Sequence, residues 1–386
     1  MMFFVPLHFQ MTKTMNILHL LSWPPTPDNP TLSNFCFRHI NALPEDCSSV
    51  VLTVTTGPMA GISCSKEARY TQVQVIVRHS DNALVRKWRI WRGFQCGLTY
   101  VRQHFFVPDL IHVHVTYPAG SVALYWKKRY GTPYVITEHW TGYQPQNSDQ
   151  LSASSLRLLK RIARHASTIM PVSEDLARNM RRCGMEGNYR VIYNVTDTGC
   201  FTLREPNSQD CKQILHVSTL RDDAKNFSGI LRVMERLHKQ RNDFVLNVVH
   251  DYEAPQAFRD FVQQHGLAET VIFHGRKSAA EMAEMYRHSD FLLLFSNFEN
   301  LPCVIVEALA CGVPVLATRV GGIAEIVNNT RGVLVDAGDE EALLAQTNFL
   351  LDHARSYDAE AIRQYAVTNF APKVIGEQIR SVYGER

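Results

Sequence analysis

Short apolar runs alternate with segments of helical length along the first half of the chain. The runs that predict buried strands are residues 16–22, 50–55, 73–77, 110–115, 134–138 and 168–172. A helix is predicted from about residue 31 to residue 43, and helical segments separate the later runs. Because such alternation is typical of βαβ units, the first half predicts a parallel sheet covered by helices.

The second half repeats this scheme. Its predicted strands are residues 214–218, 244–249, 271–274, 291–295, 314–318 and 331–335, with helices in most of the intervals. Between the halves, residues 198–212 are rich in polar residues, Gly and Pro, which favours a linker. We therefore expect an α/β chain of two domains, 1–197 and 213–386, whose last helices pack back towards the first domain. Two such halves enclose a cleft, which is a common place for ligands.

One charged residue interrupts the most apolar helix of the second half. Residues 304–310 read Val-Ile-Val-Glu-Ala-Leu-Ala, and Gly312 and Pro314 then end the helix. A helix that is apolar on every side is expected to be buried. Because an unpaired buried carboxylate is costly, Glu307 must meet a partner or line a cavity.

A second carboxylate, Glu299, precedes this helix in the loop after the predicted strand 291–295. In open α/β sheets, ligands bind at the edge where the strands end. The alternative is a capping box, because Ser296-x-x-Glu299 before an apolar run has that pattern. Glu307 lies too far along the helix for such a role. Two carboxylates around one buried helix favour acceptors for the hydroxyl groups of a polyhydroxylated ligand.

The order of these motifs resembles that of a known family. Glu299 and Glu307, the following Ala-Leu-Ala-Cys-Gly-Val-Pro-Val, and Gly321-Gly322-Ile-Ala-Glu325 are similar to the family 4 retaining glycosyltransferases, which have the two-domain GT-B fold. The resemblance implies two Rossmann-like domains with parallel sheets facing a central cleft. It implies that Glu299 contacts the donor sugar and Glu307 the nucleotide ribose, with Asn300 and Leu301 also in the donor site. Retention through a front-face transfer without an obligatory metal is implied as well, and no cofactor is expected beyond the nucleotide-sugar co-substrate.

Lys225 follows the first predicted strand of the second half and lies where a helix begins, near Asn226. A helix N-terminus with a lysine is a ready site for an anion such as a diphosphate. The family's loop reads Gly-Arg-Leu-x-x-x-Lys, and Lys225 matches its lysine. Ser218-Thr219 take the place of Gly-Arg, and the loop is one residue longer. Whether Arg221 or Thr219 replaces the family's phosphate-binding arginine stays open. The alternative for Lys225 is an exposed lysine at a helix start.

His139 ends the predicted strand 134–138, and the resemblance implies that it is catalytic together with Glu299. An imidazole can donate a hydrogen bond to a sugar hydroxyl or shuttle a proton near neutral pH. The alternative is a strand-end histidine bonded to backbone. His112 and His114 share one face of another strand. Since the sequence shows no third ligand, they favour core or cleft wall over a metal site.

Composition describes an ordinary globular chain, with 45% hydrophobic and 20% charged residues among 386. Nine scattered cysteines without a CxxC pair favour a reduced cytosol over disulfides or a zinc site. No apolar run reaches the ~18–20 residues of a membrane span. Residues 1–14 lack a basic leader and a small-residue cleavage site, and they are interpreted as an over-extended start.

Positive charge is concentrated in the first half. Residues 1–197 carry 21 Lys and Arg against 12 Asp and Glu, a net charge of +9, whereas residues 198–386 carry −6. Basic residues interleave with Trp and Phe at 87–94, and further basic clusters lie at 127–129, 157–164 and 178–182. Each cluster alone is readily explained as a solvated helix face. Their common sign predicts an anionic partner, and we expect a cytoplasmic protein on the inner membrane face rather than one that binds nucleic acid.

These patterns predict a glycosyltransferase that moves a sugar from a nucleoside-diphosphate sugar to a glycan or lipid-linked acceptor, in cell-surface polysaccharide synthesis. Two alternatives remain open. One is an epimerase or phosphorylase on the same fold, and the other is a non-catalytic protein that binds sugar nucleotides. Two further departures from the family affect the phosphate and base contacts. The family's glycine after the first strand falls near Ser33, and His250-Asp251-Tyr252 replaces a glycine-rich turn.

Overall fold

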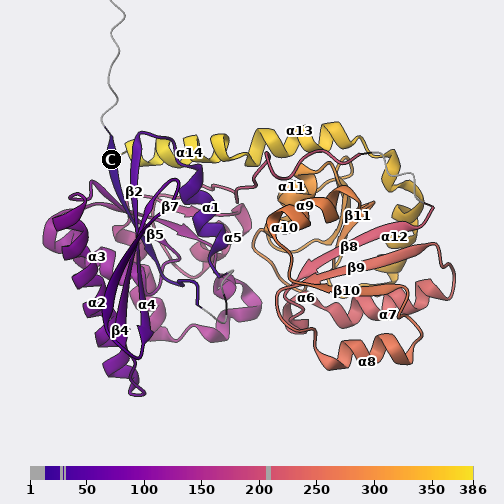
Figure 1. Cartoon of the computed structure of the whole chain (residues 1–386), viewed down its shortest axis with the longest axis horizontal. Coiled ribbons are helices and arrows are strands. Elements are labelled where there is room, and N and C mark those ends of the chain that lie inside the picture. Colours follow the sequence, from indigo (N-terminus) through magenta and orange to yellow (C-terminus); the bar gives the residue numbers. More distant parts are fainter. Residues whose placement is uncertain (1–13, 27–28, 30–31, 206–209, 386) are drawn as a thin grey trace, which may run out of the picture.

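Two parallel sheets stand side by side, each between layers of helices, and two long helices run across the top of both (Figure 1). A computed structural model describes residues 14–26, 29, 32–205 and 210–385. Residues 1–13 and 206–209 are therefore outside the described part, and so are most of the predicted over-extended start and part of the predicted linker.

The first sheet has the strand order β3-β4-β2-β1-β5-β6-β7. Its strands are β1 (Met15–Leu21), β2 (Cys47–Gly57), β3 (Gly61–Lys66), β4 (Thr71–Arg78), β5 (Leu110–His114), β6 (Tyr134–Glu138) and β7 (Ile169–Pro171). All neighbours pair in parallel except β3, which runs antiparallel to β4 at the sheet edge. The sequence pattern missed β3, because every residue of this strand is exposed and it has no apolar face.

Helices of the first half connect these strands. They are α1 (Asn34–Ala42), α2 (Ala83–His104), α3 (Ala119–Tyr130), the short turns η1 (Thr141–Tyr143) and η2 (Pro145–Gln150), α4 (Ala153–His165) and α5 (Glu174–Arg182). Before α1, Ser33 has a φ of 66°, in the left-handed region that favours glycine. The backbone at Ser33 therefore has the conformation that the family's glycine would adopt most easily.

The second sheet has the order β10-β9-β8-β11-β12-β13, and all its strands are parallel. They are β8 (Lys212–Ser218), β9 (Phe244–His250), β10 (Val271–Gly275), β11 (Phe291–Leu294), β12 (Val315–Thr318) and β13 (Gly332–Val335). Its helices are α6 (Asp222–Lys225), α7 (Phe227–His238), α8 (Gln256–Gln264), α9 (Ala279–Arg287), α10 (Cys303–Ala310), α11 (Ile323–Ile326) and α12 (Glu340–His353), followed by η3 (Ala354–Ser356). Two parallel α/β units confirm the predicted fold class of two Rossmann-like domains.

The last two helices, α13 (Ala359–Phe370) and α14 (Pro372–Gly384), lead from the second sheet back to the first (Figure 1). Helix α13 packs on α10, and α14 packs on α1. A Cβ atom at Gly376 of α14 would lie 1.8 Å from the carbonyl oxygen of Ala42, so only glycine allows this approach. The helices thus tie the two sheets together, while the limits 1–197, 198–212 and 213–386 stay predictions.

Helix α10 lies deep in the second half, and six of its eight residues are buried. This position explains the apolar sequence of residues 304–310, and it places Glu307 in the interior. Among the described residues, no helix is both long enough and apolar enough to cross a membrane.

Candidate functional site

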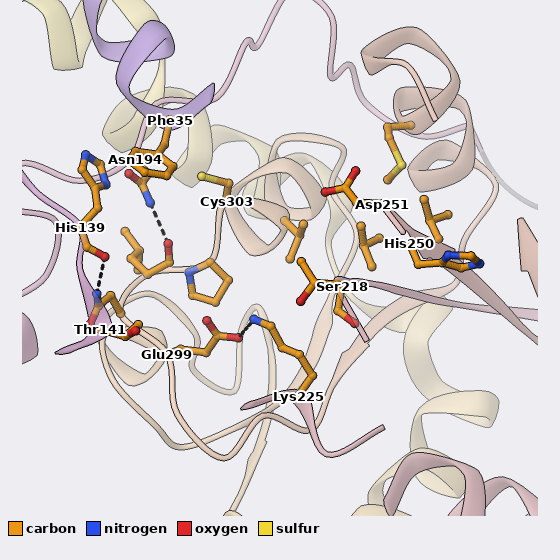
Figure 2. A pocket seen from close by; sticks show the side chains of 18 of the residues that line it. Phe35, His139, Thr141, Asn194, Ser218, Lys225, His250, Asp251, Glu299 and Cys303 are labelled. Carbon is orange, nitrogen blue, oxygen red and sulfur yellow. Dashed lines mark hydrogen bonds and ion pairs between the residues drawn. The ribbon is translucent and has the colours of Figure 1, made fainter. Parts of the chain in front are cut away.

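A cavity of about 480 Å³ opens between the two halves, at the ends of their parallel strands (Figure 2). The first half contributes Phe35, His139, Thr141, Val172 and Asn194 to its wall. The second half contributes residues from the loop after β8, residues 250 and 251 at the end of β9, Lys277, and residues 299–304. The predicted residues Lys225, Glu299, Asn300, Leu301 and His139 therefore line one cavity.

Glu299 and Lys225 point towards each other in this cavity and form an ion pair (Figure 2). The same carboxylate oxygen accepts a hydrogen bond of 2.8 Å from the hydroxyl of Ser296. Helix α10 begins only at Cys303, with Pro302 as its N-cap. The capping-box alternative for Ser296 and Glu299 is therefore wrong, because neither residue caps this helix.

In the loop before Lys225, the structure separates the two residues between which the sequence left the phosphate contact open. Thr219 lines the cavity, whereas Arg221 is exposed and forms an ion pair of 2.5 Å with Asp223. In this pair the Arg221 guanidinium donates a hydrogen bond to the Asp223 carboxylate, which lowers the pKa of Asp223. Of the two residues proposed to replace the family's arginine, only Thr219 is among the described residues that line the cavity.

Glu307 is almost fully buried and meets two partners. Its Oε1 lies 2.6 Å from Nη2 of Arg38 in α1, and its Oε2 accepts a hydrogen bond of 3.0 Å from the hydroxyl of Tyr286 in α9. Burial, the largest single influence, lowers the pKa of the Arg38 guanidinium, but the charge and hydrogen bond of Glu307 act together with Cys303 and Tyr286 to raise it overall. Of the two expectations for Glu307, a partner or a place in a cavity wall, the structure shows the partner. The described residues that line the cavity do not include Glu307.

His139 lies at the end of β6, with its ring 4.1 Å from that of Phe35 between centroids. Its main-chain carbonyl accepts a hydrogen bond of 2.6 Å from Asn300 Nδ2, and its ring Nε2 is buried without a partner among the described residues. Burial lowers the pKa of His139 well below its ordinary value, and His39 lowers it further. The imidazole is therefore neutral at physiological pH, with one N–H available as a donor.

Glu138, which the sequence pattern did not single out, fixes the backbone around His139. One of its carboxylate oxygens accepts hydrogen bonds of 2.8 Å from the backbone N–H groups of His139 and Trp140, and the other accepts from Thr116. Burial raises the pKa of Glu138, although these hydrogen bonds act in the opposite direction. A glutamate at the last position of a buried strand was the signal that could have identified it.

Several hydrogen bonds cross the cleft beside the cavity. Gln144 Nε2 donates to the carbonyl of Glu299 at 3.0 Å and to Asn300 Oδ1 at 2.9 Å. Asn194 Nδ2 donates to the carbonyl of Leu301 at 2.7 Å. Glu325 accepts hydrogen bonds of 3.0 and 2.8 Å from the first two backbone N–H groups of α5. The loop 299–301 is therefore held by both halves of the chain.

Gly321 lies where the turn after β12 meets the loop that carries Glu299. Its φ is +55°, and a Cβ atom there would lie 2.1 Å from the carbonyl oxygen of Glu299. The glycine thus lets the turn after β12 pack directly against the loop that carries Glu299.

The two histidines of β5 have a third neighbour, His19 of β1, which the sequence pattern did not reveal. Strands β1 and β5 pair so that His19 stands opposite His112, and His19 Nδ1 lies 3.1 Å from His114 Nε2. Burial lowers the pKa of all three rings. Both ring nitrogens of His112 are hydrogen-bonded, to the hydroxyls of Tyr383 at 2.6 Å and Thr137 at 2.7 Å. This bonding occupies both nitrogens of His112, whereas His114 Nδ1 is buried without a partner among the described residues. The three rings offer nitrogen atoms within 4.8 Å of one another, so the lack of a third ligand no longer argues against a metal site here.

Comparisons with known proteins agree with this geometry. The description "Glycosyltransferase Family 4" matches residues 34–199, and "Glycosyl transferases group 1" matches residues 203–367. The chain belongs to the family 4 glycosyltransferases, as the sequence motifs predicted.

Among curated relatives, the chain is 25% identical over 289 residues to the N-acetyl-alpha-D-glucosaminyl L-malate synthase of Bacillus anthracis, covering 71% of this chain and 74% of that protein. Among solved structures, sucrose-phosphate synthase from Thermosynechococcus elongatus superposes with a TM-score of 0.79 at 19% identity, over 96% of this chain and 98% of the other. HepE from Anabaena, solved in complex with UDP and glucose, gives 0.74 at 18% identity, over 96% and 99%. The protein is a glycosyltransferase of GT-B fold that takes its sugar from a nucleotide sugar.

Proposed function

We propose that the protein is a retaining, metal-independent transferase that moves a sugar from a nucleoside-diphosphate sugar to a glycan or lipid-linked acceptor. The observation that carries this proposal is the meeting of Lys225 and Glu299 in a cavity walled by both halves of the chain. One group has the charge to hold a diphosphate and the other the oxygens to accept sugar hydroxyls, and the first half supplies His139 across from them.

In this mechanism, Lys225 exchanges its partner when the donor binds. Its ammonium group moves from Glu299 to the diphosphate, and Glu299 then accepts hydrogen bonds from the sugar hydroxyls. The bond between C1 and the phosphate oxygen breaks while the acceptor hydroxyl attacks C1 from the same face, and the acceptor proton passes to the departing phosphate. Lys225 stabilises the charge that develops on the leaving diphosphate. Neutral His139 donates a hydrogen bond to the sugar near the reacting face.

Activity is expected to survive chelation, because Lys225 carries out the charge stabilisation that a divalent cation would otherwise provide. Turnover should be measured with and without excess EDTA in the same buffer. Loss of activity in the chelator that manganese or magnesium restores would contradict the metal-free step.

The donor is proposed to be a UDP-sugar, since HepE, which shares the fold, binds UDP and glucose in its solved complex. A screen of common nucleotide sugars without an acceptor tests this proposal. Slow release of the free sugar together with UDP is the expected result, because water can replace the acceptor. An epimerised nucleotide sugar, or a sugar phosphate formed in phosphate buffer, would contradict it and favour the alternative enzymes. Binding without turnover over any acceptor would favour a non-catalytic protein.

Replacing Glu307 with Gln is expected to weaken donor binding by about 1.5–3 kcal/mol, the contribution of a hydrogen bond to a charged group. The amide keeps the volume of the side chain but removes the charge proposed to receive the ribose hydroxyls. Calorimetry with UDP gives the affinity, and thermal unfolding gives the stability.

Glu340→Gln is the matched control for this variant. It breaks an ion pair of 2.5 Å with Arg232 in the same half, and Glu340 is not among the cavity-lining residues. It should leave UDP binding unchanged. If Glu307→Gln instead lowers only the melting temperature and retains wild-type affinity, Glu307 has a structural role alone.

We further propose that the first half docks on an anionic membrane surface on the cytoplasmic side. The support is a surface of exposed apolar and basic residues on α2 and on the turn between β2 and β3. Met59, Leu84 and Trp88 are 79%, 78% and 58% exposed. Lys87 and Arg92 flank Trp88, and the Arg92 guanidinium lies 5.4 Å from the centre of its ring. Exposed apolar side chains with basic residues around them suit binding to an anionic membrane surface.

Reversing the charge of Lys87, Arg89 and Arg92 together is expected to reduce binding to vesicles that contain anionic lipid. Each engaged basic residue contributes about 1 kcal/mol at low ionic strength, and added salt should weaken wild-type binding steeply. Donor hydrolysis should be unaffected, because the three residues lie outside the cavity lining. Failure of the wild-type protein to sediment with such vesicles in low salt would contradict membrane docking and favour a soluble acceptor.

A further inference from the structure

The ion pair between Arg38 and Glu307 joins the two halves of the chain close to the cavity wall. Arg38 belongs to α1 in the first half, and Glu307 belongs to α10 in the second. Glu307 keeps 7% of its side-chain surface exposed and Arg38 32%. Since 269 positions separate them in sequence, this contact exists only while the two halves are together.

On its own helix, each partner of the ion pair lies about one turn from a residue that lines the cavity. Phe35, three positions before Arg38 on α1, lines the cavity, and so do Cys303 and Val304, four and three positions before Glu307 on α10. Residues three or four positions apart lie on the same face of a helix. Glu307 therefore lies on the same face of α10 as Cys303 and Val304, about one helical turn beyond the part of the wall that they form.

Both partners keep unused hydrogen-bonding capacity. Each carboxylate oxygen of Glu307 has one protein partner, Arg38 or Tyr286, and can accept a further hydrogen bond. The other terminal nitrogen of Arg38, Nη1, is buried without a partner among the described residues. A buried guanidinium nitrogen without an acceptor is costly. A ligand with several hydroxyl groups would offer both donors and acceptors at this point.

We propose that Arg38 is a positioning residue of the donor site, which holds the Glu307 carboxylate oriented to receive the ribose hydroxyls of the nucleotide. This inference rests on the proposed function, because it assigns the ribose of a nucleoside-diphosphate sugar to Glu307. Its new content is that the first half completes the ribose site. The donor is then bound fully only when α1 and α10 are in contact.

Stability alone is a poor explanation of the pair. A buried ion pair contributes little to folding compared with apolar residues of similar size, because two charges must leave water. Nη1 of Arg38 also has no partner within the described part of the chain, and a contact that served folding alone would be more stable with that nitrogen paired.

The test compares UDP with 2′,3′-dideoxy-UDP on the wild-type chain and on Arg38→Ala and Arg38→Lys. In the wild-type protein, removing the ribose hydroxyls should weaken binding about 10- to 100-fold. Arg38→Ala should bind UDP about 10-fold more weakly and lose little more with the dideoxy analogue, because its Glu307 is no longer positioned. Arg38→Lys keeps the positive charge and should recover part of the difference between the two nucleotides.

Turnover gives an independent readout. For Arg38→Ala, the donor KM should rise in proportion to the UDP affinity lost, while kcat changes by less than about threefold, as expected for a contact made equally in the ground and transition states. Arg164→Ala is the matched control. It removes an arginine of the first half that pairs at 3.2 Å with Glu186 on the surface, and it should alter neither quantity.

Three results would overturn the inference. Arg38→Ala could bind UDP as tightly as the wild type and still discriminate against the dideoxy analogue, which would make Arg38 irrelevant to the ribose. It could bind UDP more tightly, which would make Arg38 a competitor of the ribose. If Arg38→Ala does not fold, an Arg38→Lys variant that folds but shows wild-type discrimination and KM would exclude the need for the guanidinium. Failure of the wild type to bind UDP, ADP and GDP would overturn the proposed function itself.

Discussion

Lys225→Ala is expected to lower turnover with the nucleotide sugar about 100- to 1,000-fold, the usual effect of removing one preorganised group that stabilises transition-state charge. Lys225 pairs with Glu299 in the cavity and is assigned to the diphosphate. Because uridine carries no phosphate, its affinity should change little. Steady-state kinetics with the donor and calorimetry with uridine and UDP measure the two effects.

Lys239→Ala is the matched control for this variant. Lys239 is exposed just after α7 and pairs at 2.6 Å with Glu235 of that helix, and it is not among the described residues that line the cavity. It should retain full turnover. An equal loss of affinity for uridine and UDP in Lys225→Ala would place Lys225 away from the phosphates.

Gly321→Ala is expected to destabilise the chain and to weaken the donor site together. A non-glycine residue at a φ of +55° carries about 1–3 kcal/mol of backbone strain. In addition, the new Cβ would lie 2.1 Å from the carbonyl oxygen of Glu299, so the loop 299–301 must move. Urea unfolding should show the loss of stability, and UDP-sugar binding should fall because Glu299 leaves its position.

Gly266→Ala separates these two effects. Gly266 has a φ of +68°, similar to Gly321, but the space around its Cβ position is open among the described atoms within 4 Å. It should show a loss of stability from strain alone, with unchanged donor binding. Gly321→Ala with the same modest loss of stability and full affinity would mean that the Glu299 loop adapts without cost to the site.

The central strands β5, β6, β11 and β12 were predictable because each is a short, mainly apolar run whose residues are all buried, and such runs are visible in the sequence. The exposed strand β3 lacks this signal and was missed. Glu299 and Glu307 stood out for a related reason, since a carboxylate in an apolar context needs an explanation. Lys225 was found through its position before a helix.

The partners of these residues were not predictable in the same way. Arg38 lies in an unremarkable helix, and its pairing with Glu307 depends on how two domains come together. His19 joins His112 because β1 and β5 are neighbours in the sheet, although β2 to β4 separate them in sequence. Glu138 was overlooked beside His139. Local patterns identify residues that require a partner, and the tertiary arrangement decides which partner they have.

The return of α14 to the first sheet has a consequence for the order in which the chain folds during synthesis. Tyr383 of α14 contacts His112 in the middle of β5, and Ile375 and Ile379 belong to the same apolar cluster as Ile17 and Leu110. The ribosome makes these residues only after the entire second domain. The first domain therefore leaves the ribosome with one apolar face uncovered. This face must stay able to bind α14 until the second domain has formed. In a fragment that ends near residue 197, that face would stay exposed. Addition of α14 as a separate peptide should cover it.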